Sequence, residues 1–144
     1  PILVYDEKEK MIAAIHAGWK GAFKGIIKRT LNFMIKKGCD PKNVTAVIGP
    51  CISVKNYEVK KDFIKKLIKK DGKNKKFFKK IQNKDFFDLK KYVLSQLKAL
   101  NIKKIDIINK NTFNPKNNFF SARRSISRNE NDYGRNISVI MINS

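Results

Sequence analysis

The clearest fold signal in the chain is the stretch Met11-Ile12-Ala13-Ala14-Ile15-His16-Ala17-Gly18-Trp19-Lys20-Gly21. Its five leading apolar residues are typical of a buried strand, and the two glycines that follow His16 permit a tight turn. A helical pattern comes directly afterwards. The stretch therefore predicts a strand-turn-helix unit in which His16 lies at the carboxyl end of the strand, beside the amino end of the next helix.

His16 and Trp19 are the only histidine and the only tryptophan of the chain. Open α/β sheets bind ligands at this edge, and helix N-termini favour anions. Imidazole is also the side chain most often used to bind a metal or to move a proton near neutral pH. A lone histidine in such a turn is as often a structural hydrogen-bonding residue, and a lone tryptophan is usually a core residue. On this segment alone, both interpretations stay open.

The remaining sequence predicts strands interleaved with helices. Residues 2–6 and 11–16 suggest a hairpin, and further strands are expected at 44–48, 105–108 and 137–142. Apolar stripes at helical spacing predict helices near 22–37, 58–70 and 88–100. We therefore expect a single domain over residues 1–144, of the α/β (or α+β) class, with a mixed sheet flanked by helices. Residues 71–74 are the best candidate for a mobile loop, and 109–136 are expected to form a long functional loop.

Size and composition restrict the class of protein. The chain has 144 residues, of which 42% are hydrophobic, as expected for a globular protein. It contains no apolar run near the roughly 20 residues of a membrane span, so we expect no membrane partner. It opens without Met inside a strand-like run, Pro1–Asp6, so we expect the chain to be a fragment and its opening residues not to be a signal peptide. Its two cysteines are too few for a disulfide framework and favour a reducing, cytoplasmic location.

The formal net charge of +21 raises the question of nucleic-acid binding. Lysine dominates over arginine, and the lysine pairs at 60–61, 65–66, 69–70 and 79–80 are interpreted as solvated helix faces. Lysine, asparagine and isoleucine also rise together in AT-rich coding sequence. We therefore expect weak, non-specific binding to polyanions at low salt, and no specific nucleic-acid partner.

Three further segments have a distinctive composition, although each one alone has an ordinary structural explanation. They are Ile48-Gly49-Pro50-Cys51-Ile52 with Tyr57-Glu58-Val59, then Phe119-Phe120-Ser121-Ala122-Arg123-Arg124, and finally Tyr133-Gly134-Arg135-Asn136. Cys51 is expected to be a buried inert thiol rather than a nucleophile. Tyr57 and Glu58 are expected to pack against and cap the second helix.

Together with residues 16–21 and Asp88-Leu89, these segments resemble the YfiH family, in order and over nearly the whole chain. This family is also called the laccase-domain or multicopper polyphenol oxidoreductase family. The resemblance implies a YfiH-like fold and an enzyme that cleaves purine nucleosides with phosphate or deaminates adenosine. Family members carry a longer N-terminal half, so the chain corresponds to the C-terminal portion of the family fold.

The resemblance also implies a zinc site with three protein ligands. His16 is the one ligand present in this chain, and the other two, a His and a Cys, belong to the longer N-terminal half. His16 is thus the candidate catalytic residue and metal ligand, and the chain alone should bind zinc weakly. Neither Cys39 nor Cys51 occupies a matching position. Copper is not expected, because a blue-copper centre needs two His and a Cys.

The implied substrates are a purine nucleoside and phosphate. Guanidinium groups suit phosphate, so the candidate substrate-binding residues are Lys20, Arg123, Arg124 and Arg135. If Arg123 and Arg124 lie on an extended segment they point to opposite sides, so that at most one reaches the substrate. Arg124 is the first choice and Arg123 the second. The alternative class of function is a non-catalytic family remnant that binds polyanions or a partner chain through its basic surface.

Overall fold

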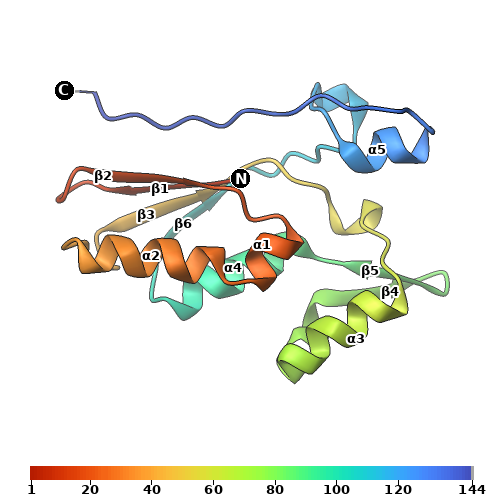
Figure 1. Ribbon diagram of the computed structural model, residues 1–144, viewed down its shortest axis with the longest axis horizontal. Coiled ribbons are helices and arrows are strands. Elements are labelled where there is room, and N and C mark those ends of the chain that lie inside the picture. The colour runs from red at the N-terminus through yellow and green to blue at the C-terminus, as the bar shows by residue number, and fades with distance from the viewer. Residues whose placement is uncertain (144) are drawn as a thin grey trace. The chain divides into compact units, whose positions relative to one another are not determined.

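The computed structural model describes residues 1–143 and divides into two compact units (Figure 1). The first, called here the sheet unit, contains Pro1–Pro50, Val93–Lys110 and the residues from Ile137 onward. The second, the hairpin unit, contains Cys51–Tyr92 and Asn111–Asn136. The two units are described separately below.

The sheet unit is built on a four-stranded mixed sheet in the order β2-β1-β3-β6. β1 (Ile2–Asp6) pairs antiparallel with both β2 (Met11–Ile15) and β3 (Val44–Ile48), and β3 pairs in parallel with β6 (Lys104–Ile107). Four of the five predicted strands are therefore confirmed to within one residue at each end. The predicted class, α/β (α+β) with a mixed sheet flanked by helices, is also confirmed.

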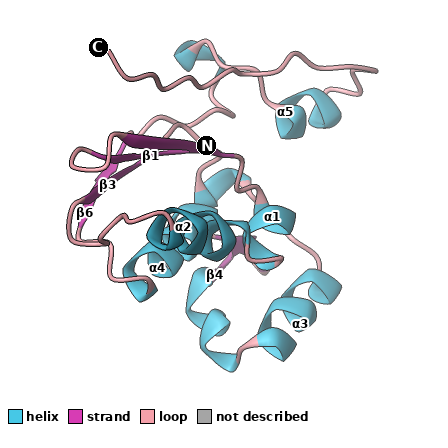
Figure 2. Ribbon diagram, turned by 60° about the vertical axis from the view of Figure 1, so that its left-hand side comes forward, coloured by secondary structure: helices cyan, strands magenta, loops and turns pink. Residues whose placement is uncertain are grey.

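Helices cover one face of this sheet. α2 (Ile26–Lys36) and the C-terminal part of α4 (Leu89–Ala99) lie along the same face in both ribbon views (Figures 1 and 2). Period-two alternation in the strands and helical spacing in the helices turn the apolar side chains toward each other. The buried residues of this core include Ile2, Val4, Ala46, Ile48, Ile27, Leu31, Met34 and Leu97.

The predicted helix near 22–37 is two helices. α1 (Trp19–Phe23) begins three residues earlier than expected, and α2 follows after a break. Gly25 causes the break, because its φ of +82° lies in the left-handed region that glycine adopts without steric cost. The stripe on α2 is otherwise as predicted, except that Ile35 at its C-terminal end is 39% exposed.

The last predicted strand, 137–142, does not form. Within residues 1–143 no strand pairs with this segment, although its apolar run Val139-Ile140-Met141-Ile142 is typical of a strand. Ile137 and Met141 remain 87% and 73% exposed. An apolar run favours a buried strand, but a strand also needs a neighbour that accepts its backbone hydrogen bonds.

The hairpin unit combines short helices with a two-stranded sheet. Its elements are η1 (Val54–Asn56), α3 (Lys61–Lys70), η2 (Gly72–Phe77), β4 (Phe78–Ile81), β5 (Lys84–Phe87), η3 (Pro115–Asn117) and α5 (Ala122–Ser127). The core is aromatic: Phe87 is fully buried, and its ring centroid lies 5.1 Å from that of Phe63 and 5.7 Å from that of Tyr57. Leu67 of α3 is also fully buried and Phe63 packs on Phe87, which confirms the predicted stripe on this helix except for Val59, which precedes it.

The β4–β5 hairpin was not predicted, and it displaces two expectations. Lys79 and Lys80 lie on β4 rather than on a helix. Glu58 forms an isolated bridge with Phe86 and an ion pair with Lys84 at 3.1 Å, so the chain is extended there, and α3 begins at Lys61 rather than near 58. The prediction that Glu58 caps the helix is wrong, whereas Tyr57 is buried as expected.

Two predicted loops contain regular structure. In residues 71–74, the Asp71 carboxylate accepts a hydrogen bond from the Lys73 backbone N–H at 2.9 Å and caps η2. Asn74 is buried and donates from Nδ2 to the Leu67 carbonyl at 2.8 Å. The long segment 109–136 contains η3 and α5. No helix among the described residues is long and apolar enough to cross a membrane.

Candidate functional site

His16 lies in the short connection between β2, which ends at Ile15, and α1, which begins at Trp19. Its side chain is exposed. This is the strand-turn-helix position that the sequence predicts. The structure therefore presents the imidazole to solvent at the end of a strand rather than in a sealed core.

The two glycines after His16 are explained by close approach and not by a left-handed backbone. Gly18 has a φ of −61°, which any residue can adopt. A Cβ on Gly18 would lie 3.3 Å from His16 Nε2, and a Cβ on Gly21 would lie 3.0 Å from the His16 carbonyl oxygen. Both distances are shorter than ordinary carbon contacts. A side chain at either glycine position would therefore require the His16 imidazole or its backbone to shift.

Lys20 is held beside the aromatic residue that precedes it. Its Nζ lies 5.8 Å from the ring centroid of Trp19, a cation–π distance, and the side chain is exposed. Trp19 is half-buried and meets the Phe23 ring edge-on at 6.4 Å. Because α1 has five residues, its dipole adds little to anion binding at this point.

The residues described here do not fit a complete zinc site. Within residues 1–143, no group of three or more His, Cys, Asp or Glu side chains is close enough to hold a metal ion. A catalytic zinc is normally held by three protein ligands, and His16 is a single one.

Cys39 lies near the start of β2, whereas His16 follows its end. The Cys39 Sγ is 3.7 Å from Sδ of Met11, the first residue of β2. Burial raises the pKa of this thiol to about 11, with further contributions from a hydrogen bond to Asp6 and from the charges of Asp6 and Glu9. A buried neutral thiol at this position is a core residue.

Cys51 belongs to the hairpin unit, where it forms an isolated bridge with Asn111. Burial raises the pKa of its thiol, an effect that the positive charge of Lys90 partly offsets. A thiol that stays protonated at neutral pH is a poor nucleophile. The thiol is half-buried and not buried as expected, and its raised pKa agrees with the expectation that it is inert.

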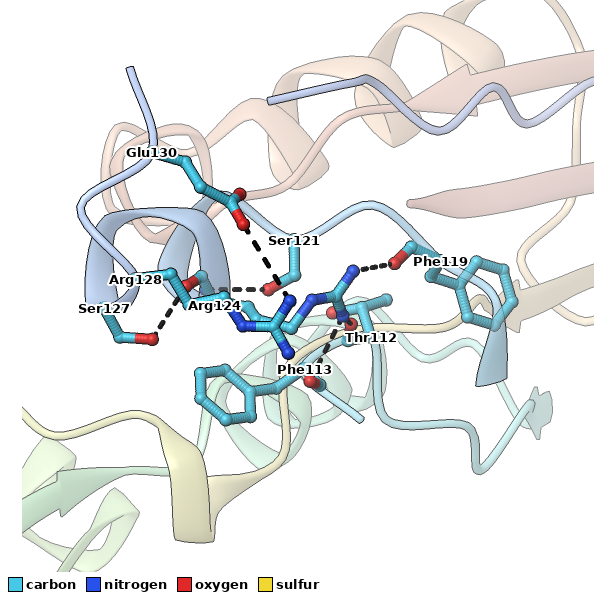
Figure 3. A network of polar contacts seen from close by, with 8 residues as sticks. All are labelled: Thr112, Phe113, Phe119, Ser121, Arg124, Ser127, Arg128 and Glu130. Atoms are coloured by element: carbon cyan, nitrogen blue, oxygen red, sulfur yellow. Dashed lines mark hydrogen bonds and ion pairs between the residues drawn. The ribbon is translucent and has the colours of Figure 1, made fainter. Parts of the chain in front are cut away.

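Arg124 ties together three points of the backbone (Figure 3). Its guanidinium donates to the carbonyl oxygens of Thr112 at 2.8 Å, Phe113 at 3.1 Å and Phe119 at 2.6 Å. The segment before α5 is thereby joined to the helix itself. Arg124 therefore has a structural role. Three hydrogen bonds to backbone carbonyls already use much of the N–H donor capacity that binding a phosphate would need.

The Arg123 side chain points away from that of Arg124 on the same helix. Its guanidinium carbon lies 5.1 Å from the Tyr57 ring centroid, and Nη1 donates to the Glu58 carbonyl at 3.1 Å. The two arginines lie on α5, so the expectation of an extended segment is wrong, although they do diverge. The helix forms because the Ser121 hydroxyl accepts from the Arg124 backbone N–H at 3.3 Å and caps it.

Arg135 makes its contacts with its own neighbours in the chain. It forms an ion pair with Asp132 at 3.9 Å and a hydrogen bond with the Tyr133 carbonyl, and its guanidinium carbon lies 3.9 Å from the Tyr133 ring centroid. The side chain is exposed. Nearby, Asn136 and Phe120 exchange two hydrogen bonds of 2.8 and 2.9 Å, which fix this segment beside the one that leads into α5.

An asparagine network in the hairpin unit was not predicted from the sequence. Asn111 Oδ1 accepts from the backbone N–H of Ser53 at 3.1 Å and of Phe113 at 3.0 Å, and its Nδ2 donates to Asn56 Oδ1 at 2.9 Å. Asn117 donates in turn to the Asn111 carbonyl at 2.8 Å. The network holds the chain after Cys51 against the start of the long segment. The density of asparagine at 109–118 was its only signal in the sequence.

The candidate residues thus divide between the two units. His16 and Lys20 belong to the sheet unit, and Arg123, Arg124 and Arg135 belong to the hairpin unit. Within the hairpin unit, α5 brings the two adjacent arginines next to Tyr57, Glu58 and the long segment.

With this fold and these residues, the chain matches a known family over its described length. The family model described as multi-copper polyphenol oxidoreductase laccase matches residues 1–143. The chain belongs to this family.

Curated relatives of the chain are named purine nucleoside phosphorylase. The chain is 37% identical over 139 residues to one from Rickettsia conorii, a match that covers 95% of this chain and 57% of the relative. It is 37% identical over 127 residues to one from Rickettsia prowazekii (87% and 52%), and 33% identical over 143 residues to one from Haemophilus influenzae (97% and 55%). The chain spans about half the length of these relatives.

Solved structures share the fold. The YfiH protein of Bacillus licheniformis superposes with a TM-score of 0.77 at 28% identity, over 87% of this chain and 49% of that protein. YlmD of Geobacillus stearothermophilus gives a TM-score of 0.73 at 21% identity, over 88% and 48%. The expectation of a YfiH-like fold is confirmed.

Proposed function

We propose that this chain is part of a purine nucleoside phosphorylase. The proposal rests on His16, whose exposed side chain follows the end of β2 and lies close to Gly18. It rests also on the 37% identity of the chain to a relative named purine nucleoside phosphorylase. In this reaction a phosphate oxygen attacks the anomeric carbon of the nucleoside. The bond to the purine nitrogen breaks, and the base leaves with a proton, so the products are free base and sugar phosphate.

The chain supplies part of the site in this proposal. The remainder belongs to the half of the relatives' length that this chain does not span. Both units described above would then belong to one domain, the C-terminal portion of the family fold, working in the cytoplasm. His16 would be one of three ligands of a zinc ion, the other two coming from outside residues 1–144. A bound zinc would supply Lewis-acid chemistry and an acidified water molecule.

Among the arginines, the contacts favour Arg123 over Arg124 as the phosphate ligand. Arg124 gives its donors to three backbone carbonyls. Arg123 donates one hydrogen bond within residues 1–143, and a guanidinium has five N–H donors. Its stacking on Tyr57 fixes the plane of the guanidinium at little further entropic cost. Lys20 of the sheet unit and Arg135 of the hairpin unit are exposed cations that would serve as further substrate-binding residues.

A second reaction, deamination of adenosine, would use the same zinc ligand, His16. There a water molecule adds to the purine carbon that carries the amino group, and ammonia leaves. The two reactions differ in their need for phosphate and in their products, which makes them separable in a single experiment.

The test is chromatography of inosine and adenosine incubated with the protein made from its complete coding sequence, with and without phosphate. We expect hypoxanthine from inosine only when phosphate is present, and loss of this activity in His16→Ala. Arg135→Ala, at a residue that contacts only its own neighbours, serves as a weaker comparison and should retain part of the activity. Both nucleosides unchanged, with zinc occupancy verified by metal analysis, would refute the proposal.

A further inference from the structure

Lysine is concentrated in one segment of the hairpin unit. Residues 60–84, called here the lysine-rich segment, contain twelve lysines, and their acidic residues are Asp62 and Asp71. The segment thus holds more than a third of the 33 basic residues of the chain in 25 of its 144 positions. A compositional bias of the coding sequence raises lysine everywhere, so it does not account for this clustering.

The fold presents these charges on the outside of a continuous set of elements. All twelve lysines are exposed, on α3, η2, β4, the first residue of β5 and the residue that precedes α3. α3 contacts η2, and η2 contacts β4. The apolar side of α3 faces the core, where Leu67 is fully buried, so its lysines are the groups left to face solvent. The result is a dense cationic surface carried by neighbouring elements.

The side chains beside these lysines narrow the class of ligand. Proteins that bind single strands stack bases on exposed aromatic side chains. The aromatic residues of the segment, Phe63, Phe77 and Phe78, are half-buried or buried and pack in the aromatic core. Helices that lie in a membrane interface insert an apolar face. The apolar face of α3 is turned inward, and Ile81 is the one large hydrophobic residue of the segment that is exposed.

Without exposed aromatic side chains or an exposed apolar face, the lysine-rich segment presents mainly ammonium groups. Such a surface suits a ligand with a high linear charge density. Double-stranded nucleic acid carries about one negative charge per 1.7 Å of its axis. Lys61, Lys65 and Lys69 lie four residues apart along α3 and span about 12 Å. A duplex presents about seven charges over that length. We propose that the lysine-rich segment is a binding site for the phosphate backbone of double-stranded nucleic acid, without sequence preference.

This inference is independent of the catalytic proposal. It predicts an interaction that neutralises phosphates and releases counterions, so affinity falls steeply with salt. Sequence should have no effect, because the lysines contact backbone phosphates and not base edges.

The test is fluorescence anisotropy of a labelled duplex of about 30 base pairs, titrated with the 144-residue chain between about 50 and 200 mM salt. The variant replaces four exposed lysines of the segment by glutamine: Lys61, Lys65, Lys69 and Lys73. The control removes the same number of charges from exposed lysines of the sheet unit: Lys24, Lys28, Lys36 and Lys42. Thermal melting followed by circular dichroism verifies that both variants are folded.

We expect the segment variant to bind at least tenfold more weakly at the lowest salt. The slope of log affinity against log salt should become shallower by about 0.9 for each phosphate that the variant no longer neutralises. The control variant should stay within about twofold of the parent protein. Equal weakening of binding in the two variants would overturn the proposal, as would an unchanged segment variant. Tighter binding to a single strand, or to anionic lipid vesicles at matched charge, would equally overturn it.

Discussion

Replacing Arg124 by alanine should destabilise the hairpin unit by about 3 kcal/mol. The side chain donates three hydrogen bonds, to the carbonyls of Thr112, Phe113 and Phe119. Hydrogen bonds from charged groups contribute about 1.5–3 kcal/mol each, but these three share one half-buried guanidinium, so their effects do not add fully. The expected loss of about 3 kcal/mol is therefore smaller than the roughly 4.5–9 kcal/mol that a simple sum of three such bonds would give.

The assay is equilibrium unfolding in urea. With a slope of about 2 kcal/mol per molar, a loss of about 3 kcal/mol lowers the midpoint by about 1.5 M. Arg124→Lys keeps the charge without the planar fork and should lose about half as much. The matched control is Arg128→Ala in the same region, whose ion pair with Glu130 is exposed and 3.8 Å long. This control should change stability by less than about 0.5 kcal/mol.

Equal urea midpoints for the Arg124→Ala and Arg128→Ala variants would refute the structural role of Arg124. The direction of the effect on activity is also informative. If Arg124 acts by holding the backbone, the activity of its variants should follow their folded fraction. A raised KM for phosphate at unchanged stability would instead place Arg124 on the substrate.

The remaining predictions concern Arg123, the core and a buried thiol. Arg123→Gln should raise the KM for phosphate at least several-fold in steady-state kinetics, while urea unfolding shows a stability change of less than about 1 kcal/mol. An unchanged KM, or a higher KM that is matched by a large loss of stability, would contradict a role in phosphate binding. Leu97→Ala should cost about 2–5 kcal/mol in urea unfolding because Leu97 is fully buried, and a loss below about 1 kcal/mol would contradict the packing of α4. Cys39, whose pKa is raised from 9.0 to about 11, should resist alkylation at about pH 8 until the protein unfolds. Its folded state holds the proton more tightly than the unfolded state, so stability should fall as pH rises from about 9 to about 11, and a Cys39→Ala variant should lack this part of the decline.

Local patterns were sufficient to predict most of the sheet unit. β1, β2 and β3 are short apolar runs bounded by turn residues, and their side-chain alternation is set by the strand itself. The helix stripes predicted around Leu67 and Leu97 are confirmed for the same reason. The position of His16 was predictable because a strand, two glycines and a helix follow one another directly in the sequence.

Structure that depends on distant partners was not predictable. The apolar run at 137–142 indicates a strand, yet pairing requires a neighbouring strand that no local pattern can identify. The β4–β5 hairpin was missed because its strands, Phe78–Ile81 and Lys84–Phe87, contain adjacent aromatic and adjacent charged residues instead of alternation. Its tight turn depends on positive φ at Gln82 and Asn83, where glycine would have been the clearer signal.

The candidate site shows the same limit. The sequence indicates that arginines at 123 and 124 are chemically capable of binding phosphate, but not which one is already engaged. Arg124 donates to backbone carbonyls, which every residue has. No residue type in the sequence therefore indicates its structural role. The asparagine network around Asn111 is hidden for a related reason, because its partners are backbone N–H groups and a second amide 55 residues away.

The most direct test of the account is the phosphate dependence of inosine cleavage by the protein made from its complete coding sequence. We predict that hypoxanthine and a sugar phosphate appear in equal amounts, that omission of phosphate stops both, and that His16→Ala abolishes the reaction without loss of fold. Cleavage at full rate in the His16→Ala variant, or no cleavage by the folded, zinc-loaded parent protein, would contradict the central claim.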